Sequence, residues 1–381
     1  MGKHVMNRKC SGGLFVLIAA FFAIILSFIA CNVHPYFSVS DNAEKKDDLN
    51  IVKNASEVIN NIAADALSDI VYVKKTYSID EAADTAPKPD SSCYGETYDT
   101  AVIREIIDSA AELLDGQDTI WNEDIEFYTG KPFRYYYDET ILAISWKQIV
   151  NGCFCTYAEV KIADGSQIRR KLAEDTYGSS LKYYQSTLAD EANAVISMDG
   201  DFYTYRYGGI TVYKREIYRY NPEKIDDCFV TADGDLLLIY ADRFSCEDEA
   251  AQYIKDNDVV FSLAFGPILV DDGQVRHVES YPIGEVKLPY SRAAIGQYDK
   301  LHYVMLTIGH EGGCTPCTTN EAADIIAKTG VKTAYTVDGG QTAEIYMNGE
   351  ILNFVDFNAE RYVSDIIYFA TAIPESESNH E

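Results

Sequence analysis

Hydrophobic and polar residues change their spacing several times along this chain, and each change predicts a different kind of structure. The uncharged run 12–31 has the length of a helix that crosses a bilayer, which is about 20 residues. Apolar residues then recur at helical spacing over 51–73, which predicts an amphipathic helix. A short helix is expected at 102–114. Beyond Asp138 the pattern changes to short β-rich segments separated by Gly, Asp and Pro.

The region after Asp138 alternates strands with helices. Strands are expected at 141–146, 156–162, 194–198, 236–240 and 259–265. Helices are expected at 167–174, at 248–255, and from the capping box Thr318 to Glu321 up to Gly330. This alternation predicts an α/β fold of the mixed α+β kind, with a mixed β-sheet core and interspersed helices.

One β-α-β unit is especially clear, with a strand at 303–308, a helix at 321–328 and a strand at 332–337. Ligands bind at the carboxyl ends of the strands in such units. The loop at 309–313 and the turn at 338–340 are therefore expected at one edge of the sheet. After that turn, Asn348-Gly349 predicts a hairpin between 343–347 and 351–354.

Lys3, Arg8 and Lys9 precede the apolar run, so the N-terminus is expected in the cytoplasm and the remainder outside it. A cleaved signal peptide and a lipoprotein signal ending at Cys31 are alternatives to a permanent anchor. The predicted organisation is a cytoplasmic N-terminus (1–11), a transmembrane anchor (12–31), a stalk and helical region (32–137) with a linker at 86–92, a main domain (138–374) and a tail (375–381). The expected location is the cell membrane, single-pass, with the bulk extracytoplasmic.

The chain has 32 Lys and Arg against 60 Asp and Glu, a net charge of −28. Such an acidic chain is repelled by phosphate backbones, so nucleic acid is excluded as a partner. Solubility on a crowded surface explains the charge without a specific cation.

Nine cysteines are present, and seven of them follow the apolar run. An exported chain keeps its cysteines in an oxidising compartment, which predicts disulfide bonds with one thiol left over. The alternative is a zinc site built from two pairs, Cys153 with Cys155 and Cys314 with Cys317, although their spacing matches no common zinc module.

Candidate chemistry lies where strands end. Asp199, Asp201 and Asp338 are carboxylates flanked by glycine, a pattern that simple turns also produce. Their combination with Arg292 is more specific, because an arginine fork binds phosphate and two carboxylates can divide the roles needed at an anomeric carbon. A loop histidine and glutamate, His310 and Glu311, are further candidates. No nucleotide-binding loop, nucleophile elbow or HExxH pair occurs, so no cofactor and no metal are predicted.

Five segments, 196–203, 264–273, 291–296, 337–342 and 360–365, together resemble the phosphodiester glycosidase family in order and spacing. This family includes the uncovering enzyme and bacterial exopolysaccharide-associated relatives. Its usual motifs are Asn-Gly-Asp-Phe, Arg-Thr/Ser-Ala-Ile-Gly and Asp-Gly-Gly-Gly-Ser, with Asp-Gly-Arg after a preceding strand. This chain departs from them at Asp199, Ala293, Gln341 and Thr342, and it has Gly309-His310-Glu311 in place of Asp-Gly-Arg.

The resemblance implies an extracytoplasmic hydrolase that cleaves the glycosidic bond of sugar-1-phosphodiesters, such as N-acetylglucosamine-1-phosphodiesters, in cell-surface glycans. The expected catalytic residues are Asp338, Asp201 and Glu311, and the expected substrate-binding residues are Arg292, Gly339, Gly340, Gln341, Asp199 and His310. The expected partners are a sugar-phosphate or surface glycopolymer substrate and the membrane. A non-catalytic glycan-binding or exopolysaccharide assembly factor of the same fold is the alternative, and a cation-dependent surface protein is a third hypothesis. No oligomeric state is predicted.

Overall fold

Two antiparallel β-sheets form the centre of the protein. The computed structural model describes residues 77–374, apart from 223, 283 and 284. The larger sheet has the order β1 (Tyr94–Thr97), β2 (Phe133–Tyr137), β3 (Ile141–Val150), β4 (Cys153–Ile162), β16 (His302–Gly309), β15 (Arg292–Asp299), β17 (Thr333–Val337), β13 (Ile268–Asp271) and β14 (Gln274–Val275). The smaller sheet has the order β19 (Glu350–Ile351), β18 (Ile345–Met347), β7 (Ile196–Asp199), β21 (Asp365–Phe369) and β5 (Ile168–Leu172).

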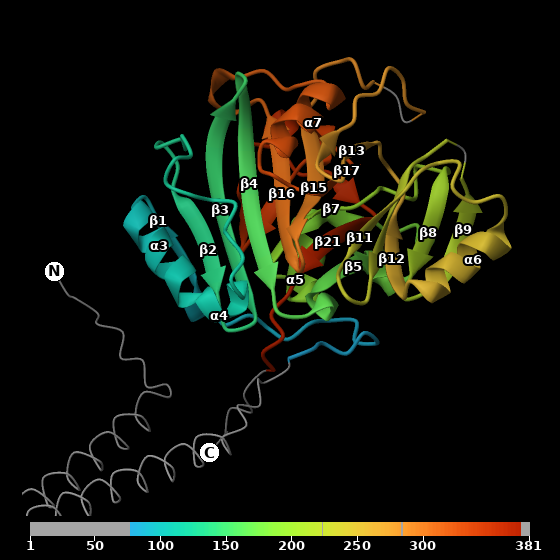
Figure 1. Cartoon of the computed structure of the whole chain (residues 1–381), viewed down its shortest axis with the longest axis horizontal. Helices are drawn as coiled ribbons and strands as arrows, with labels where there is room; N and C mark the ends of the chain where they lie inside the picture. The colour runs from blue at the N-terminus through green and yellow to red at the C-terminus, as the bar shows by residue number, and fades with distance from the viewer. Residues whose placement is uncertain (1–76, 223, 283–284, 375–381) are drawn as a thin grey trace, which may run out of the picture. The chain divides into compact units, whose positions relative to one another are not determined.

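The alternation of side chains along the central strands explains how the layers pack. On β15, Ala293 and Ile295 are buried between the two sheets, whereas Ala294 faces the opposite side. That outer face is covered by α7 (Thr319–Ala327) and α3 (Thr100–Ser109). The outer face of the smaller sheet is covered by α5 (Gln185–Ala192). The central layers are therefore helix, sheet, sheet and helix (Figure 1).

A smaller lobe with its own apolar cluster lies beside this core (Figure 1). It contains a three-stranded sheet, a hairpin and one helix: β11 (Leu236–Ile239), β10 (Asp227–Thr231), β12 (Val259–Leu263), β8 (Gly209–Tyr213) with β9 (Glu216–Asn221), and α6 (Glu247–Asp256). A short ribbon pairs β6 (Tyr183–Tyr184) with β20 (Tyr362–Val363). The lobe and the ribbon flank the sheet edge that carries the candidate site.

Most predicted elements after Asp138 are confirmed, including α6, α7 with its capping box, and the hairpin at Asn348 and Gly349. The helix expected at 167–174 is wrong, because this segment forms β5 and pairs with β21. Its charged residues suit a buried strand since Arg170 and Lys171 both find carboxylate partners. The expectation of a mixed sheet is also wrong among the described strands. Their pairings are all antiparallel, because β15 separates the parallel-running β16 and β17.

The expected boundary at residue 138 differs from the structure. β1 and β2 belong to the larger sheet, and α3 packs against it together with α4 (Ala111–Leu114). Ile79 and Ala86 are also buried, so the chain before Asp90 contributes to the core. The predicted anchor, the amphipathic helix at 51–73 and the tail lie outside the described residues. None of the helices between 77 and 374 has the length and hydrophobicity to cross a bilayer.

The predicted disulfides are not found: none of the seven cysteines between 77 and 374 forms a disulfide bond. Cys153 and Cys155 lie two residues apart on β4, and the Cys155 thiol contacts the Cys153 carbonyl at 3.7 Å. Cys228, on β10, is buried in the central apolar cluster. Within the described part of the chain, no group of three or more His, Cys, Asp or Glu side chains is placed to hold a metal ion.

Candidate active site

The candidate site lies where strands from both sheets end. Arg292, the first residue of β15, pairs with Ile308 near the end of β16, and Ala293 pairs with Val337 at the end of β17. The loop after β16 and the turn after β17 therefore share one edge, as the β-α-β pattern predicts. The Asp338 N–H then donates a hydrogen bond to the Gly200 carbonyl at 3.0 Å, which joins this edge to the end of β7 in the smaller sheet.

Glycine is required at this junction because the backbones approach closely. A Cβ atom on Gly200 would lie 1.9 Å from a carboxylate oxygen of Asp365, and one on Gly339 would lie 2.7 Å from the Ser291 carbonyl. Gly340 has a φ angle of +64° and donates its N–H to the same Ser291 carbonyl at 2.7 Å. Gly339 and Gly340 thus hold the turn against the start of β15, where Arg292 follows Ser291.

A pocket of about 240 Å³ opens at this edge. Asp338 forms part of its wall and is 7% exposed. The wall also contains three arginines, Arg206, Arg292 and Arg361, and the backbone of the turn at Gly339 and Gly340. The pocket therefore combines two acidic residues, Asp338 and Glu285, with three arginines, although the whole chain is strongly acidic.

Asp338 and Asp199 form a pair of carboxyl groups that influence each other. One oxygen of Asp338 accepts the Gly339 N–H at 3.0 Å, and one oxygen of Asp199 accepts the Gly200 N–H at 2.8 Å. The second oxygen of each is buried and has no hydrogen-bond partner among the described residues. Burial, together with the charge of Asp338 and Asp365, raises the pKa of Asp199 well above its ordinary value. Burial also raises the pKa of Asp338, against the Gly339 N–H and the charge of Arg206.

The pKa of both carboxyl groups is raised, but their surroundings differ. Asp199 is fully buried, whereas Asp338 reaches the pocket and lies close to Arg206 and Arg361. These surroundings favour the proton on Asp199 and the negative charge on Asp338. A protonated Asp199 has the shape and neutrality of asparagine, the residue that the family motif places there.

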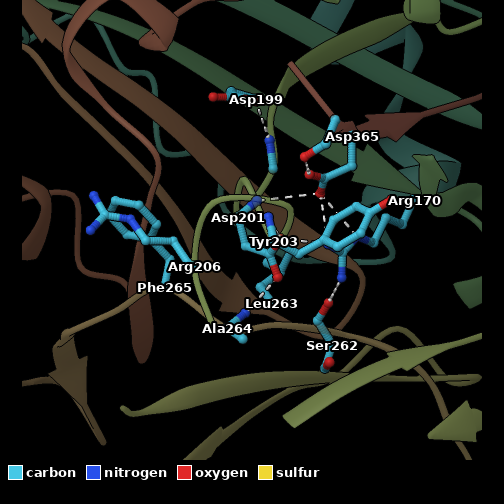
Figure 2. A network of polar contacts seen from close by, with 12 residues as sticks. Arg170, Asp199, Asp201, Tyr203, Arg206, Ser262, Leu263, Ala264, Phe265 and Asp365 are labelled. Atoms are coloured by element: carbon cyan, nitrogen blue, oxygen red, sulfur yellow. Dashed lines mark hydrogen bonds and ion pairs between the residues drawn. The ribbon is translucent and has the colours of Figure 1, made fainter. Parts of the chain in front are cut away.

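Asp201, by contrast, is occupied in a buried network that Figure 2 shows. Arg170 donates to Asp201 at 2.6 Å and to Asp365 at 2.8 and 3.0 Å, and also to the Ser262 carbonyl. Asp201 accepts two further N–H groups, from Tyr203 at 3.0 Å and Ala264 at 2.8 Å. All three charged side chains are fully buried. Asp201 therefore positions the loop after β7, and Asp199 points away from this network in Figure 2.

Glu311 and His310 lie in the loop after β16, and neither is part of the pocket wall. Glu311 forms ion pairs with Lys147 at 3.0 Å and Lys131 at 2.9 Å. Although burial opposes ionisation, these two lysines hold the pKa of Glu311 below its ordinary value. His310 is half-exposed and contacts Asp356 at 3.0 Å. The structure thus does not bring these two predicted residues together with Asp338 in the pocket.

Arg292 lines the pocket and Gln341 does not, and both side chains form hydrogen bonds that hold loops in place. The Arg292 guanidinium donates to the carbonyls of Cys317, Glu285 and Leu288 at 3.2, 3.0 and 2.7 Å. It therefore fixes the loop before β15 while one edge of the group faces the pocket. Gln341 donates to the Ala359 carbonyl at 3.0 Å, which ties the turn after β17 to the segment that carries Arg361.

Sequence reasoning missed the two arginines that are most available to a ligand. Arg206 lies over the Phe265 ring at 5.4 Å, and Arg361 lies over the Phe202 ring at 4.8 Å. Among the described residues, neither side chain forms an ion pair or a hydrogen bond. Arg361 lies in a segment that carries the family resemblance, which was a usable signal. Arg206 lies in a loop without a motif, and no pattern marked it.

Comparison with known proteins finds one family that matches part of the chain. Residues 192–370 match the profile of the family described as phosphodiester glycosidase. The resemblance expected from the sequence is therefore confirmed over that segment, which contains Asp199, Arg292, Asp338 and Arg361. No curated protein sequence matches the chain.

Several solved structures are similar to the chain, each at 12% identity. One is the zebrafish N-acetylglucosamine-1-phosphodiester alpha-N-acetylglucosaminidase catalytic domain auto-inhibited by its pro-peptide, with a TM-score of 0.49 over 61% of this chain and 83% of that one. Another is a hypothetical protein from Synechocystis, with a TM-score of 0.47 over 62% and 63%. A third is a putative exported protein from Burkholderia pseudomallei, with a TM-score of 0.40 over 57% and 74%. The similarity to the family rests on the profile match over residues 192–370.

Proposed function

We propose that this protein is an extracytoplasmic hydrolase that cleaves the bond between the anomeric carbon of a sugar and the phosphate of a sugar-1-phosphodiester. The observation that carries the proposal is the pocket in which Asp338 lies beside Arg206 and Arg361, two cations without a carboxylate partner among the described residues. The family match over 192–370 supports the same reaction class.

In the proposed reaction, Arg206 and Arg361 bind the phosphate oxygens, and the free edge of Arg292 assists them. Asp338 faces the anomeric carbon and either stabilises the oxocarbenium-like centre or attacks it. The bond from the anomeric carbon to the phosphate oxygen breaks, and its electron pair leaves with the phosphomonoester. Water supplies the hydroxyl group of the released sugar, and its remaining proton passes to solvent. A phosphomonoester is a weak base, so this departure needs little protonation.

Asp199 and Asp201 have supporting roles in this proposal. A neutral Asp199 keeps a second negative charge away from the bound phosphate, and Asp201 holds the loop after β7 through Arg170. Glu311, with its carboxylate bound by two lysines, stabilises the loop after β16. Location outside the cytoplasm is proposed from the basic residues before the apolar run 12–31.

The test is hydrolysis of sugar-1-phosphodiesters, led by an N-acetylglucosamine-1-phosphodiester, by the full chain in detergent. Free sugar should appear, and Asp338→Asn should reduce its rate by about 10³-fold or more without lowering the melting temperature. Glu311→Gln serves as the matched carboxylate control, since it should keep most of the activity. Absence of release from every diester by a folded protein would instead favour a glycan-binding or assembly role.

A further inference from the structure

A row of cations and aromatic rings leads away from the pocket along the ribbon of β6 and β20. We call it the aromatic–cationic strip and define it as Lys182, Tyr184, Tyr205, Arg361 and Tyr362. Arg361 belongs to both features, since it forms part of the pocket wall and immediately precedes β20. The strip therefore begins where the proposed phosphate site ends.

Contacts between neighbours make the strip continuous. Arg361 lies over the buried Phe202 ring at 4.8 Å, and Phe202 stacks on Tyr205 at 4.3 Å. Lys182 then lies over the Tyr205 ring at 3.6 Å. Pairing of β6 with β20 places Tyr184 on Tyr362, with ring centroids 4.5 Å apart. Packed groups thus join Arg361 to Lys182. The tyrosine pair is next to them in the chain, because Tyr362 follows Arg361 and Tyr184 lies two residues after Lys182.

The side chains of the strip are available to a ligand. Tyr205, Tyr362 and Tyr184 are 53%, 54% and 38% exposed, so their rings can be reached from solvent. Lys182 and Arg361 form no ion pair with any described carboxylate, in a protein that carries a net charge of −28. The nearby acid Glu360 directs its carboxylate to Ser186, which donates to it from N–H and hydroxyl at 3.1 and 2.9 Å. Cations that are not held in ion pairs favour an anionic partner.

The shape of the strip indicates what kind of anion fits it. Two fixed cations, Arg361 and Lys182, are separated by aromatic rings, an arrangement that matches negative groups separated by ring-shaped units. Tyrosine supplies an apolar face with a polar edge, which suits a sugar ring. The strip lies outside the pocket, so it contacts the part of the substrate beyond the bond that breaks.

We propose that the strip binds an anionic glycan chain, so that the substrate is a polymer with repeated phosphate or other acidic groups rather than a small diester. The sugar to be released occupies the pocket, its phosphate meets Arg206 and Arg361, and the following units lie along Lys182, Tyr205 and the pair Tyr184–Tyr362. This inference rests on the proposed function for the cleavage step, but binding by the strip does not depend on turnover.

Binding is the first test and uses the full chain carrying Asp338→Asn, which holds the ligand without cleaving it. The probes are an oligomer of N-acetylglucosamine 1-phosphate units joined by phosphodiesters, a neutral chitin oligosaccharide of equal length, and a single-unit methyl diester. The phosphate oligomer should bind more tightly than either other probe. Lys182→Met and Tyr362→Ala should each weaken its binding about five- to tenfold, the effect of losing one contact of about 1 kcal/mol.

Matched controls come from residues outside the strip. Lys255→Met on α6 removes an exposed cation, and Tyr98→Ala removes a ring that is 64% exposed. Neither should change oligomer binding. Equal binding of the neutral oligosaccharide, or unchanged affinity in Lys182→Met and Tyr362→Ala, would overturn the strip as an anionic glycan site.

Turnover by the chain with Asp338 intact separates the two proposals. Lys182→Met and Tyr362→Ala should lower kcat/KM for the oligomer and leave kcat/KM for the methyl diester within about twofold. Oligomer binding without cleavage of any probe would refute the hydrolase and retain the strip. Cleavage of both probes with no effect of the two substitutions would retain the hydrolase and refute the strip.

Discussion

At the scale of single residues, the site depends on which of several buried carboxyl groups carry charge. Asp201 and Asp365 face a guanidinium, Glu311 faces two lysines, and Asp338 faces the pocket arginines. Asp199 has no cation in hydrogen-bond contact among the described residues. Burial therefore decides its protonation, and the neutral form follows.

Asp199→Asn should keep activity within about fivefold of the parent at neutral pH, because it preserves the neutral form. The parent should lose activity at alkaline pH, when ionised Asp199 adds charge beside Asp338, Asp365 and the bound phosphate. That alkaline loss should vanish in Asp199→Asn, while the acid limb set by the raised pKa of Asp338 remains. A kcat/KM profile against pH measures both limbs. An inactive but folded Asp199→Asn at every pH would show that Asp199 donates a proton.

Glu344 offers a stability test that is independent of catalysis. Burial and the nearby Glu360 raise its pKa to about 9 in the folded protein, against 4.5 for the ordinary side chain. Between these values the folded state binds more protons than the unfolded state, so rising pH reduces stability by up to about 1.4 kcal/mol per unit. Glu344→Gln should therefore raise the melting temperature more at pH 8 than at pH 5.

The control for this prediction is Glu216→Gln, which changes an exposed glutamate on β9. In this variant the difference in melting temperature between pH 5 and pH 8 should be the same as in the parent. A Glu344→Gln protein whose melting temperature follows the parent at both pH values would contradict a protonated Glu344.

At the scale of elements, the Arg170 network joins β5, the loop after β7 and the start of β21. Arg170→Met should lower the free energy of unfolding by about 3–5 kcal/mol, because it leaves two buried carboxylates without their cation. Urea unfolding measures the change. Arg243→Met, which removes an ion pair that is about half exposed, should cost less than about 1 kcal/mol. Similar small losses in both variants would show that the network adds little stability.

The same network explains what sequence reasoning could and could not recover. Periodicity, capping and turn chemistry identified about half of the strands after Asp138, together with α6, α7 and the edge shared by the loop at 309–313 and the turn at 338–340. The same reasoning predicted a helix around Arg170, where the structure has β5. A strand with two buried charges has the sequence pattern of an amphipathic helix, and only the charge partners distinguish the two. Those partners, Asp201 and Asp365, lie 31 and 195 residues away. The availability of Arg206 also depends on distant contacts that local patterns do not contain.

At the scale of the whole molecule, the segment before Asp90 is part of the compact unit. The Ile79 N–H donates to Ser166 at 2.8 Å, and the Ala86 N–H donates to the Ala192 carbonyl at 3.2 Å. A chain that starts at Asp90 should therefore be less stable than one that starts at residue 77, by about 2–3 kcal/mol for the lost isoleucine burial alone. Thermal unfolding of the two chains measures this difference.

Ile79→Ala in the longer chain tests whether the stability comes from packing of this side chain and not from chain length. It should reproduce part of the stability that is lost when residues 77–89 are removed. Equal melting temperatures of the two chains would mean that residues 77–89 add nothing to the core. The result also decides where a soluble fragment for crystallography should begin.

The hydrogen bond from Asp338 to Gly200 crosses from one sheet to the other. The proposed activity therefore depends on correct strand pairing in both sheets. A strand that slips by one residue turns its side chains to the opposite face. Asp338 or Asp199 would then leave the junction, and the arginines would lose the carboxylate that they frame. A wrongly paired copy should for this reason lack the proposed hydrolytic activity altogether, and should not show an altered selectivity.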